Sequence, residues 1–328
     1  MRAFEYASPS TKEQAAGLLG NRWEDAVVFA GGTDLLSSMK DNLSAPQRLV
    51  DIKQIRELGG IGYGASSGLR VGALVTLEEL QAHPQVRKEY PGIAEAAEGV
   101  TSPQIRNRGT VGGDLCQRPR CWYYRAGFGL LAKDAEGKAL VPSGDNRYHA
   151  ILGNAGPAYF VNPSSLAPVL IALGAKVRIY SSAGAREVAL EQFFAIPKTD
   201  NDRENVLKPN EIVTEILIPA GSRRTASYEV RQKEALDWPL VSASVALDMN
   251  GNRVRSARIV MGHVAPIPWR AAEAEKVLEG KAVTEETALG AGKAAVGQAH
   301  PLSKNGYKVQ LARVAVKRAL LKAAQGGA

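Results

Sequence analysis

The sequence predicts an α+β protein whose last third forms a separate domain, an antiparallel sheet backed by helices. The chain has 328 residues, enough for two or three domains, and its 45% hydrophobic and 23% charged content is typical of globular proteins. Strand and helix patterns alternate near the N-terminus, whereas the last third reads as a run of strands followed by a run of helices. These observations divide the chain into residues 1–55, 56–221 and 222–328.

The first part is expected to form a compact β-α-β unit. Ser10 and Glu13 have the spacing of a capping box, so a helix is predicted to begin there and to run through Leu19. The other expected elements are strands at 3–6, 26–30 and 48–52 and a short helix at 34–40. The second strand ends on a glycine loop, Gly31-Gly32-Thr33-Asp34, at the strand end where ligands usually bind in α/β folds.

A second glycine loop occupies residues 109–114, with the sequence GTVGGD. It contains too many glycines for a helix or a strand interior, so we expect a turn whose successive backbone N–H groups form a nest for phosphate oxygens. Like the first loop, it places paired glycines beside Thr and Asp. Either loop alone is compatible with a simple tight turn. Together they predict one anionic ligand held from two sides, and the pyrophosphate of a dinucleotide fits that description.

The other elements of the middle part follow from local patterns. Residues 59–68 include GIGYGA, which matches a dinucleotide fingerprint in letters only, because no strand precedes it and no helix follows it; we predict a hairpin turn instead. Residues 121–148 are expected to form an irregular excursion. The predicted helices lie at 77–82, 92–98 and 166–174, and the predicted strands at 69–72, 176–180 and 212–218.

The C-terminal part shows alternating apolar positions and then helical periodicity. Strands are expected at 226–230, 242–249 and 254–260, with a turn at Asn250-Gly251-Asn252 between the last two. Helices are expected at 271–278, 285–299 and 306–323. This order predicts a sheet covered by helices.

The net charge of +8 and the isoelectric point near 9.4 raise the question of nucleic-acid binding. The basic residues are, however, interleaved with acids along the chain, so a nucleic-acid partner is not expected. One local excess flanks the second glycine loop, is opposed only by Asp114, and comprises Arg106, Arg108, Arg118, Arg120 and Arg125. A bound pyrophosphate, or the acidic face of a partner protein, would account for this cluster.

Other sequence features restrict the cellular location and the catalytic chemistry that we expect for this chain. The N-terminal residues include no apolar signal-peptide segment, and no run of about 18 apolar residues predicts a membrane span. Two cysteines, Cys116 and Cys121, fit a reducing compartment, so a cytoplasmic location is expected unless a partner carries an export signal for a whole assembly. The four histidines lack metal-ligand spacing, and no nucleophile elbow, catalytic triad or Walker A sequence occurs. We therefore predict neither a catalytic residue nor a metal site on this chain.

With both loops placed, the chain resembles the flavin-binding subunit of the molybdenum hydroxylase family, which includes xanthine dehydrogenases, carbon monoxide dehydrogenase and bacterial aldehyde oxidoreductases. Five segments in the same order carry the resemblance across nearly the whole chain: AGGTDL at 30–35, VGALVT at 71–76, QIRNRGTVGGD at 104–114, NPSSLA at 162–167 and GHVAPIPWRA at 262–271. The resemblance implies a two-lobed FAD-binding domain of the vanillyl-alcohol oxidase type, followed by the C-terminal α+β domain.

The resemblance also implies FAD as the cofactor, with its pyrophosphate held by the two loops. The implied FAD-binding residues are Ala30, Gly31, Gly32, Thr33, Asp34, Leu35, Ser102, Gly109, Thr110, Gly112, Gly113, Asp114, Cys116, Ser165, Val213 and Arg231. The family often has Asn in place of Asp114 and Asp in place of Ser165, so Ser165 would keep only a polar contact at the ribityl chain or the ring edge. Val213 and Arg231 would approach the flavin ring, although Arg231 is equally readable as a solvent-facing strand residue. Cys116 would line the flavin pocket.

The run from Cys116 to Arg125 resembles aldehyde oxidoreductase flavin subunits in particular. Some of those subunits carry a 4Fe-4S cluster in the loop that follows, held by further cysteines. Residues 126–148 contain no cysteine, and two thiolates are too few for a cluster that needs about four ligands. A 4Fe-4S cluster is therefore not expected on this chain, unless a neighbouring subunit supplies the remaining ligands.

The function implied by the resemblance is electron transfer. A molybdenum cofactor in a large partner subunit would hydroxylate an aldehyde or an N-heterocycle, and two 2Fe-2S clusters in a small partner would pass electrons to FAD on this chain. FAD would then deliver them to NAD or to another acceptor. The alternatives are a self-contained FAD-dependent oxidase or reductase of the same fold, and a non-catalytic interaction or nucleic-acid protein, which would be colourless.

Overall fold

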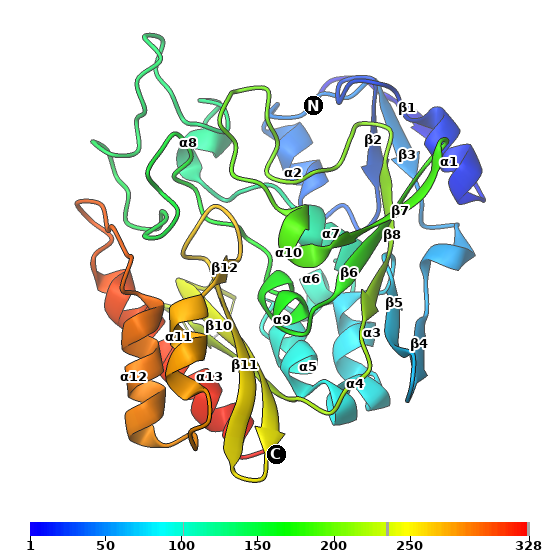
Figure 1. Cartoon of the computed structure of the whole chain (residues 1–328). Helices are drawn as coiled ribbons and strands as arrows, with labels where there is room; N and C mark the ends of the chain where they lie inside the picture. The colour runs from blue at the N-terminus through cyan, green and yellow to red at the C-terminus, as the bar shows by residue number, and fades with distance from the viewer. Residues whose placement is uncertain (101, 234–235, 327–328) are drawn as a thin grey trace.

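The computed structural model describes residues 1–100, 102–233 and 236–326, and within these residues the chain forms three sheets. The sheets have three, five and four strands, and helices pack between and around them (Figure 1). The α+β expectation is therefore confirmed, with a sheet domain at the C-terminal end. No helix of the described residues is long and apolar enough to cross a membrane.

The N-terminal sheet is parallel and has the order β1-β3-β2. Its strands and their helices are β1 (Glu5–Ala7), α1 (Lys12–Leu18), β2 (Ala26–Phe29), α2 (Leu35–Lys40) and β3 (Arg48–Asp51). The predicted β-α-β unit is confirmed, and β2 leads directly into the first glycine loop. The capping box predicted at Ser10 and Glu13 is wrong, because Thr11 is the N-cap and its hydroxyl accepts a hydrogen bond from the backbone N–H of Gln14.

The central sheet is antiparallel and has the order β4-β5-β8-β6-β7. Its strands are β4 (Ile61–Gly64), β5 (Gly68–Gly72), β6 (Lys176–Ser181), β7 (Gly184–Ala189) and β8 (Ile212–Ile218). Two of them depart from the expectation. Strand β4 pairs with β5 and replaces most of the predicted hairpin turn, because glycines at alternate positions hide its apolar pattern. Strand β7 is an exposed edge strand, so burial imposes no apolar alternation on it.

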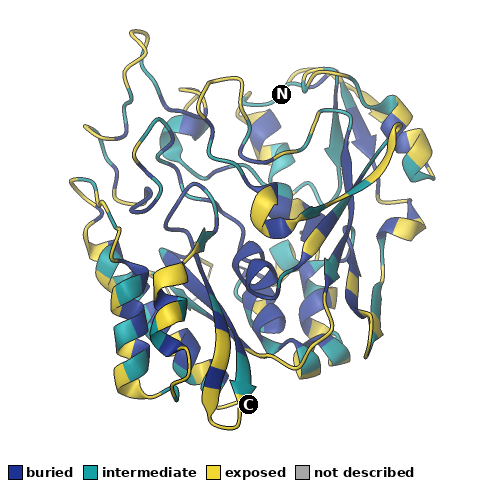
Figure 2. Ribbon diagram, in the orientation of Figure 1, coloured by how far each residue is buried: buried dark blue, intermediate teal, exposed yellow. Residues whose placement is uncertain are grey.

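Short helices connect the sheets. They are η1 (Arg56–Leu58), α3 (Leu77–Ala82), α4 (Pro84–Glu89), α5 (Pro91–Glu98), α6 (Pro103–Arg106), α7 (Val111–Cys116), α8 (Trp122–Arg125), α9 (Ala167–Ala172) and α10 (Leu190–Phe193). Helix α9 is buried along its whole length (Figure 2) and packs against α5 and against the C-terminal sheet. This helix therefore belongs to the core that joins the middle part to the C-terminal part.

Helix α7 overturns the expectation of a turn at the second glycine loop. Thr110 is its N-cap, and its hydroxyl accepts a hydrogen bond from the N–H of Gly113 at 3.1 Å. A side-chain carbon on Gly112 would lie 2.9 Å from the β-carbon of Ala73. The glycines thus permit close packing of a helix on the end of β5, rather than a left-handed turn.

The C-terminal sheet is antiparallel, with the order β12-β11-β10-β9. Its elements are β9 (Arg224–Val230), β10 (Val241–Asn250), β11 (Arg253–Gly262), β12 (Trp269–Arg270), α11 (Ala272–Leu278), α12 (Glu285–Ala295) and α13 (Tyr307–Ala324). The helices α11, α12 and α13 lie beside the sheet (Figure 1) and form an apolar core with it. The predicted strands, the turn at Gly251 and the three helices are confirmed, although α12 ends four residues earlier than the predicted 299.

The excursion predicted at 121–148 is confirmed, with α8 as the one helix in its described residues. Asn146 donates to the hydroxyl of Ser303 at 3.1 Å, and Asn305 donates to the carbonyl of His149 at 3.1 Å. The ammonium group of Lys308 donates to the carbonyls of His149 at 3.1 Å and His263 at 2.7 Å. These bonds attach the excursion to the C-terminal domain.

Candidate functional site

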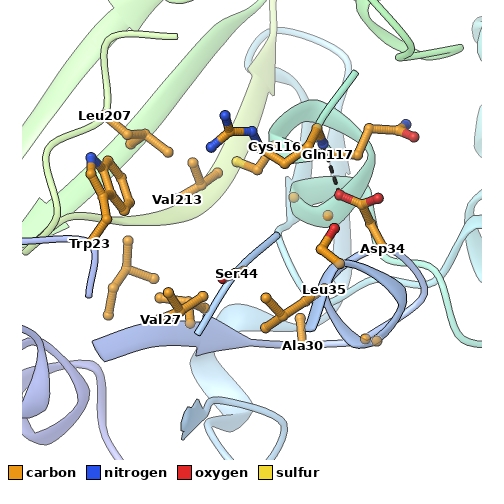
Figure 3. A pocket seen from close by; sticks show the side chains of 18 of the residues that line it. Trp23, Val27, Ala30, Asp34, Leu35, Ser44, Cys116, Gln117, Leu207 and Val213 are labelled. Carbon is orange, nitrogen blue, oxygen red and sulfur yellow. Dashed lines mark hydrogen bonds between the residues drawn. The ribbon is translucent and has the colours of Figure 1, made fainter. Parts of the chain in front are cut away.

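The two glycine loops lie at the junction of two cavities. The larger has a volume of about 440 Å³ and lies between the N-terminal sheet and the segment leading into β8 (Figure 3). The smaller has a volume of about 110 Å³ and reaches Val100, Ile105 and Trp238. The residues that line both cavities are Thr33, Asp34, Thr110, Gly113 and Gln117. A ligand that occupies both cavities therefore passes between the loops.

The loops touch through their backbones. A side-chain carbon on Gly31 would lie 1.8 Å from the carbonyl oxygen of Arg108 and 3.3 Å from the α-carbon of Gly109. Gly32 has a φ of +73°, a conformation that favours glycine. The glycines of the first loop are thus required by a close approach and by a left-handed backbone.

The two loops differ in the backbone N–H groups that they leave free. Within the described part of the chain, no hydrogen bond uses the N–H groups of residues 31–35, which line the larger cavity. In the second loop, the N–H of Val111 bonds to the carbonyl of Val75 and that of Gly112 to the carbonyl of Ala73, both at 2.9 Å. The expected nest at the second loop is therefore wrong, whereas the first loop keeps donors for an anion.

Two threonine hydroxyls complete this donor set. The Thr110 hydroxyl accepts from Gly113, which leaves its own hydrogen free to donate. Thr33 lines both cavities, and its hydroxyl makes no hydrogen bond within the described residues. An anion with several acceptor oxygens, such as a pyrophosphate, fits these donors.

Asp34 is an anchor for the segment that follows α7. Its carboxylate accepts hydrogen bonds from the backbone N–H of Arg118 and from the guanidinium group of Arg125, both at 2.8 Å, and it forms an ion pair with Arg120, also at 2.8 Å. Figure 3 shows the carboxylate turned toward this segment. The carboxylate would repel a phosphate, so only the backbone N–H of Asp34 suits a pyrophosphate.

The arginine cluster is more neutralised than the sequence suggested. Besides Asp34, Glu204 forms a 2.7 Å ion pair with Arg118, and Glu78 forms a 2.9 Å ion pair with Arg106. Asp114 is the only acidic residue between Arg106 and Arg125 in the sequence, and the folded chain adds carboxylates from distant segments.

Asp114 itself lies in the interior beside the smaller cavity. Its carboxylate accepts hydrogen bonds from the Ser164 hydroxyl, from the backbone N–H of Leu166 at 3.2 Å and from the Gln117 amide at 2.9 Å. Burial raises the pKa of Asp114 to about 6, against the opposing effect of these donors. This carboxyl group therefore titrates near neutrality.

The two cysteines have different surroundings. Cys116 lines the larger cavity (Figure 3), and burial raises the pKa of its thiol to about 12. The sulfur of Cys121 lies 3.1 Å from Nε2 of His149, and burial raises the pKa of Cys121 and lowers that of His149 to about 4. Both thiols are thus protonated at neutral pH. Among the described residues, no group of three or more His, Cys, Asp or Glu side chains is placed to hold a metal ion.

The remaining predicted residues fall into three groups. The larger cavity is lined by Ala30, Gly31, Gly32, Leu35, Gly112 and Val213. The smaller cavity is lined by Gly109 and Ser165. Ser102 and Arg231 line neither of these cavities. Ser102 caps α6 by accepting from the N–H of Ile105, and Arg231 pairs with Glu229, with 18% of its side chain exposed.

Two aromatic side chains at the cavities escaped the sequence reading. Trp23 lines the larger cavity, and the guanidinium of Arg203 lies 4.1 Å from its ring centre. Trp238 lines the smaller cavity, and the guanidinium of Arg120 lies 4.5 Å from its ring centre. Each pair joins distant segments, so no local pattern could have revealed it.

Two family models match consecutive parts of the chain. Residues 2–221 match the FAD binding domain in molybdopterin dehydrogenase, and residues 226–323 match the CO dehydrogenase flavoprotein C-terminal domain.

Relatives of known function match along nearly the whole chain. It is 31% identical over 317 residues to the aldehyde oxidoreductase FAD-binding subunit of Escherichia coli strain K12, covering 95% of this chain and 96% of that one. It is 31% identical over 322 residues to the carbon monoxide dehydrogenase medium chain of Hydrogenophaga pseudoflava, covering 97% and 96%.

Solved structures agree with these matches. A carbon monoxide dehydrogenase from Hydrogenophaga pseudoflava that lacks the Mo-pyranopterin moiety of its cofactor aligns with a TM-score of 0.76 at 31% identity, over 99% of this chain and 98% of that one. Quinoline 2-oxidoreductase from Pseudomonas putida 86 aligns with a TM-score of 0.76 at 28% identity, over 99% and 98%.

Proposed function

The chain belongs to the FAD-binding subunits of the molybdopterin dehydrogenase family, and from this premise we propose that it binds FAD between its two loops as the electron-transfer subunit of a multi-subunit molybdenum hydroxylase. The observation that carries the proposal is the junction of two cavities at residues shared by both loops. A dinucleotide has the matching shape, with two ring systems joined by a pyrophosphate. One ring system would enter each cavity.

The pyrophosphate would be held mainly by the first loop. The free N–H groups of residues 31–35 and the hydroxyls of Thr33 and Thr110 would donate to its oxygens. The side chain of Asp34 would contribute indirectly, by attaching residues 118–125 to the first loop. Val213 would contact the part of FAD that enters the larger cavity, and Ser165 the part that enters the smaller one. Ser102 and Arg231 would support the wall of the site from behind.

The reaction proposed for the assembly is distributed over several subunits. A large partner with a molybdenum cofactor would hydroxylate an aldehyde or an N-heterocycle, and a small partner with 2Fe-2S clusters would deliver electrons to this chain. Bound FAD supplies the redox chemistry that joins one-electron donors to a two-electron acceptor such as NAD. This chain would bind and orient the cofactor, which agrees with relatives that are named as medium chains.

We also propose that residues 1–55 and 56–221 form the two lobes of a FAD-binding domain of the vanillyl-alcohol oxidase type, and that residues 222–328 form the C-terminal domain. The parallel sheet and the central sheet support the two lobes, and the separate antiparallel sheet supports the third unit.

The proposal is tested by expressing this chain together with the genes next to it and purifying it by a tag on this chain alone. We expect a yellow-brown assembly that contains FAD, molybdenum and iron, with one larger and one smaller subunit. A flavin-free protein without partners would contradict the proposal.

The second candidate, a self-contained FAD oxidase or reductase, predicts a different result in the same preparation. The isolated chain with FAD would then be reduced by an aldehyde or an N-heterocycle without any partner. We expect no such reduction, because in the proposed assembly the substrate is oxidised on the molybdenum partner and this chain receives only electrons.

A further inference from the structure

Asp114 occupies an unusual position for an acidic side chain. It is 7% exposed, lies in the first turn of α7 and lines the smaller cavity together with Thr110 and Gly113. Its oxygens face the start of α9 and accept from Ser164 and Leu166, so the carboxylate joins the second loop to a fully buried helix. Within the described residues, no salt bridge reaches it.

The charged groups around Asp114 do not neutralise it. Glu229 on β9 adds a second carboxylate nearby, and Arg231 is already paired with Glu229. Arg120 interacts with Asp114 at longer range but forms its ion pair with Asp34. Cys116, on the same helix, is a protonated thiol. The hydrogen bonds stabilise the carboxylate, while burial and Glu229 oppose its charge.

We propose that Asp114 is a proton-linked positioning residue of the FAD site, whose carboxylate takes up a proton from solvent when the pyrophosphate binds beside it. The inference rests on the proposed function. A phosphate placed between Thr33 and Thr110 brings negative charge close to the carboxylate of Asp114 in a poorly solvated region. Binding and protonation therefore favour each other, as linkage requires.

The direction of the effect follows from this coupling. At low pH Asp114 is neutral before FAD arrives, and binding meets no repulsion. As the pH rises through the pKa of about 6 in the free chain, the carboxylate ionises and the affinity for FAD falls. The imidazoles of His149 and His263 stay neutral above a pH of about 4, so they do not contribute.

The test uses the full chain, stripped of flavin, and measures its dissociation constant for FAD by flavin fluorescence from about pH 5 to about pH 8. We expect wild-type affinity to fall about tenfold over this range. Asp114→Asn should bind FAD equally well at every pH, with the affinity that the wild type shows at low pH. Ser164→Ala removes a donor to the carboxylate, so the fall in affinity should move to higher pH.

A matched control and a second readout separate this role from a structural one. Asp145→Asn removes an aspartate outside both cavities and should leave the profile unchanged. Calorimetry in two buffers of different ionisation enthalpy should show proton uptake on FAD binding by the wild type and none by Asp114→Asn.

The outcomes are distinguishable. A wild-type affinity that does not depend on pH, or a pH dependence that persists in Asp114→Asn, overturns the role of Asp114 and leaves the proposed function standing. If Asp114→Asn does not fold, the shift in Ser164→Ala and the proton uptake of the wild type decide the matter. A wild-type chain that binds no FAD at any pH overturns the proposed function itself, and this inference with it.

Discussion

The backbone of Gly31 lies directly against that of Arg108, so that even one added carbon on Gly31 would come within 1.8 Å of the Arg108 carbonyl oxygen. The two loops are therefore one structural unit, although a long stretch of chain separates them. Any ligand held between them depends on this contact.

The first prediction concerns this contact. Gly31→Ala should force the loops apart, destabilise the chain by about 1–3 kcal/mol and abolish FAD retention, because the colliding atom is backbone. Unfolding in urea and the flavin content of the purified protein measure both effects. The control is Gly17→Ala in α1, where no atom lies within 4 Å of the added carbon; it should stabilise the chain by about 0.5–1 kcal/mol. Equal stability and equal flavin content in the two variants would contradict the role of Gly31.

The second prediction concerns the Thr110 hydroxyl, which caps α7 and keeps its hydrogen for a phosphate. Thr110→Ala should cost about 1 kcal/mol of stability and also weaken FAD binding. Thr110→Ser keeps the hydroxyl and should restore both properties. The comparison of FAD affinity in the two variants is decisive, since equal affinities would show that the hydroxyl does not contact the cofactor.

The third prediction concerns the anchor at Asp34. Asp34→Asn removes the charge that pairs with Arg120 and Arg125. We therefore expect the free energy of unfolding to fall by about 2 kcal/mol and proteolysis after these arginines to become faster. The control, Asp25→Asn, breaks a salt bridge to Arg22, whose side chain is 69% exposed, and should leave the stability nearly unchanged because water screens this pair. Protection of residues 118–125 that matches the wild type would argue against the anchor.

The fourth prediction concerns acid stability. Burial lowers the pKa of His263 from 6.5 to about 3, so the unfolded chain binds more protons than the folded chain between these values. Stability contributed by the neutral imidazole is therefore lost as the pH falls below 6.5, by about 1 kcal/mol per pH unit. His263→Asn keeps a residue that tolerates the φ of +63° and removes the titration. Urea unfolding at several pH values should show that the stability of this variant falls less steeply with decreasing pH than that of the wild type. The same dependence of stability on pH in both proteins would refute the role of His263.

Sequence patterns predicted the two terminal parts well for physical reasons. The strands β9, β10 and β11 have one side in an apolar core, so their side chains alternate, and Asn250-Gly251 marks the tight turn. The strands β4 and β7 escaped prediction because one is rich in glycine and the other lies exposed at an edge. Helix α7 escaped because its glycines fit it against Ala73, a reason that only the tertiary structure contains.

The parts of the candidate site that depend on residues close together in the sequence were predictable. The pairing of the glycine loops followed from their composition, but the free donors of the first loop and the occupied donors of the second depend on strand carbonyls at Ala73 and Val75. The partners of Asp34 and the approach of Arg203 to Trp23 join segments far apart in sequence. Hydrogen bonds and ring contacts of this kind leave no spacing signal.

The central claim is that the two loops enclose the pyrophosphate of one FAD, and a crystal structure of the chain grown with FAD tests it most directly. We expect the pyrophosphate oxygens within hydrogen-bond distance of N–H groups of residues 31–35 and of the hydroxyls of Thr33 and Thr110, with one ring system in each cavity. A flavin found elsewhere, with these N–H groups facing only solvent, would contradict the account.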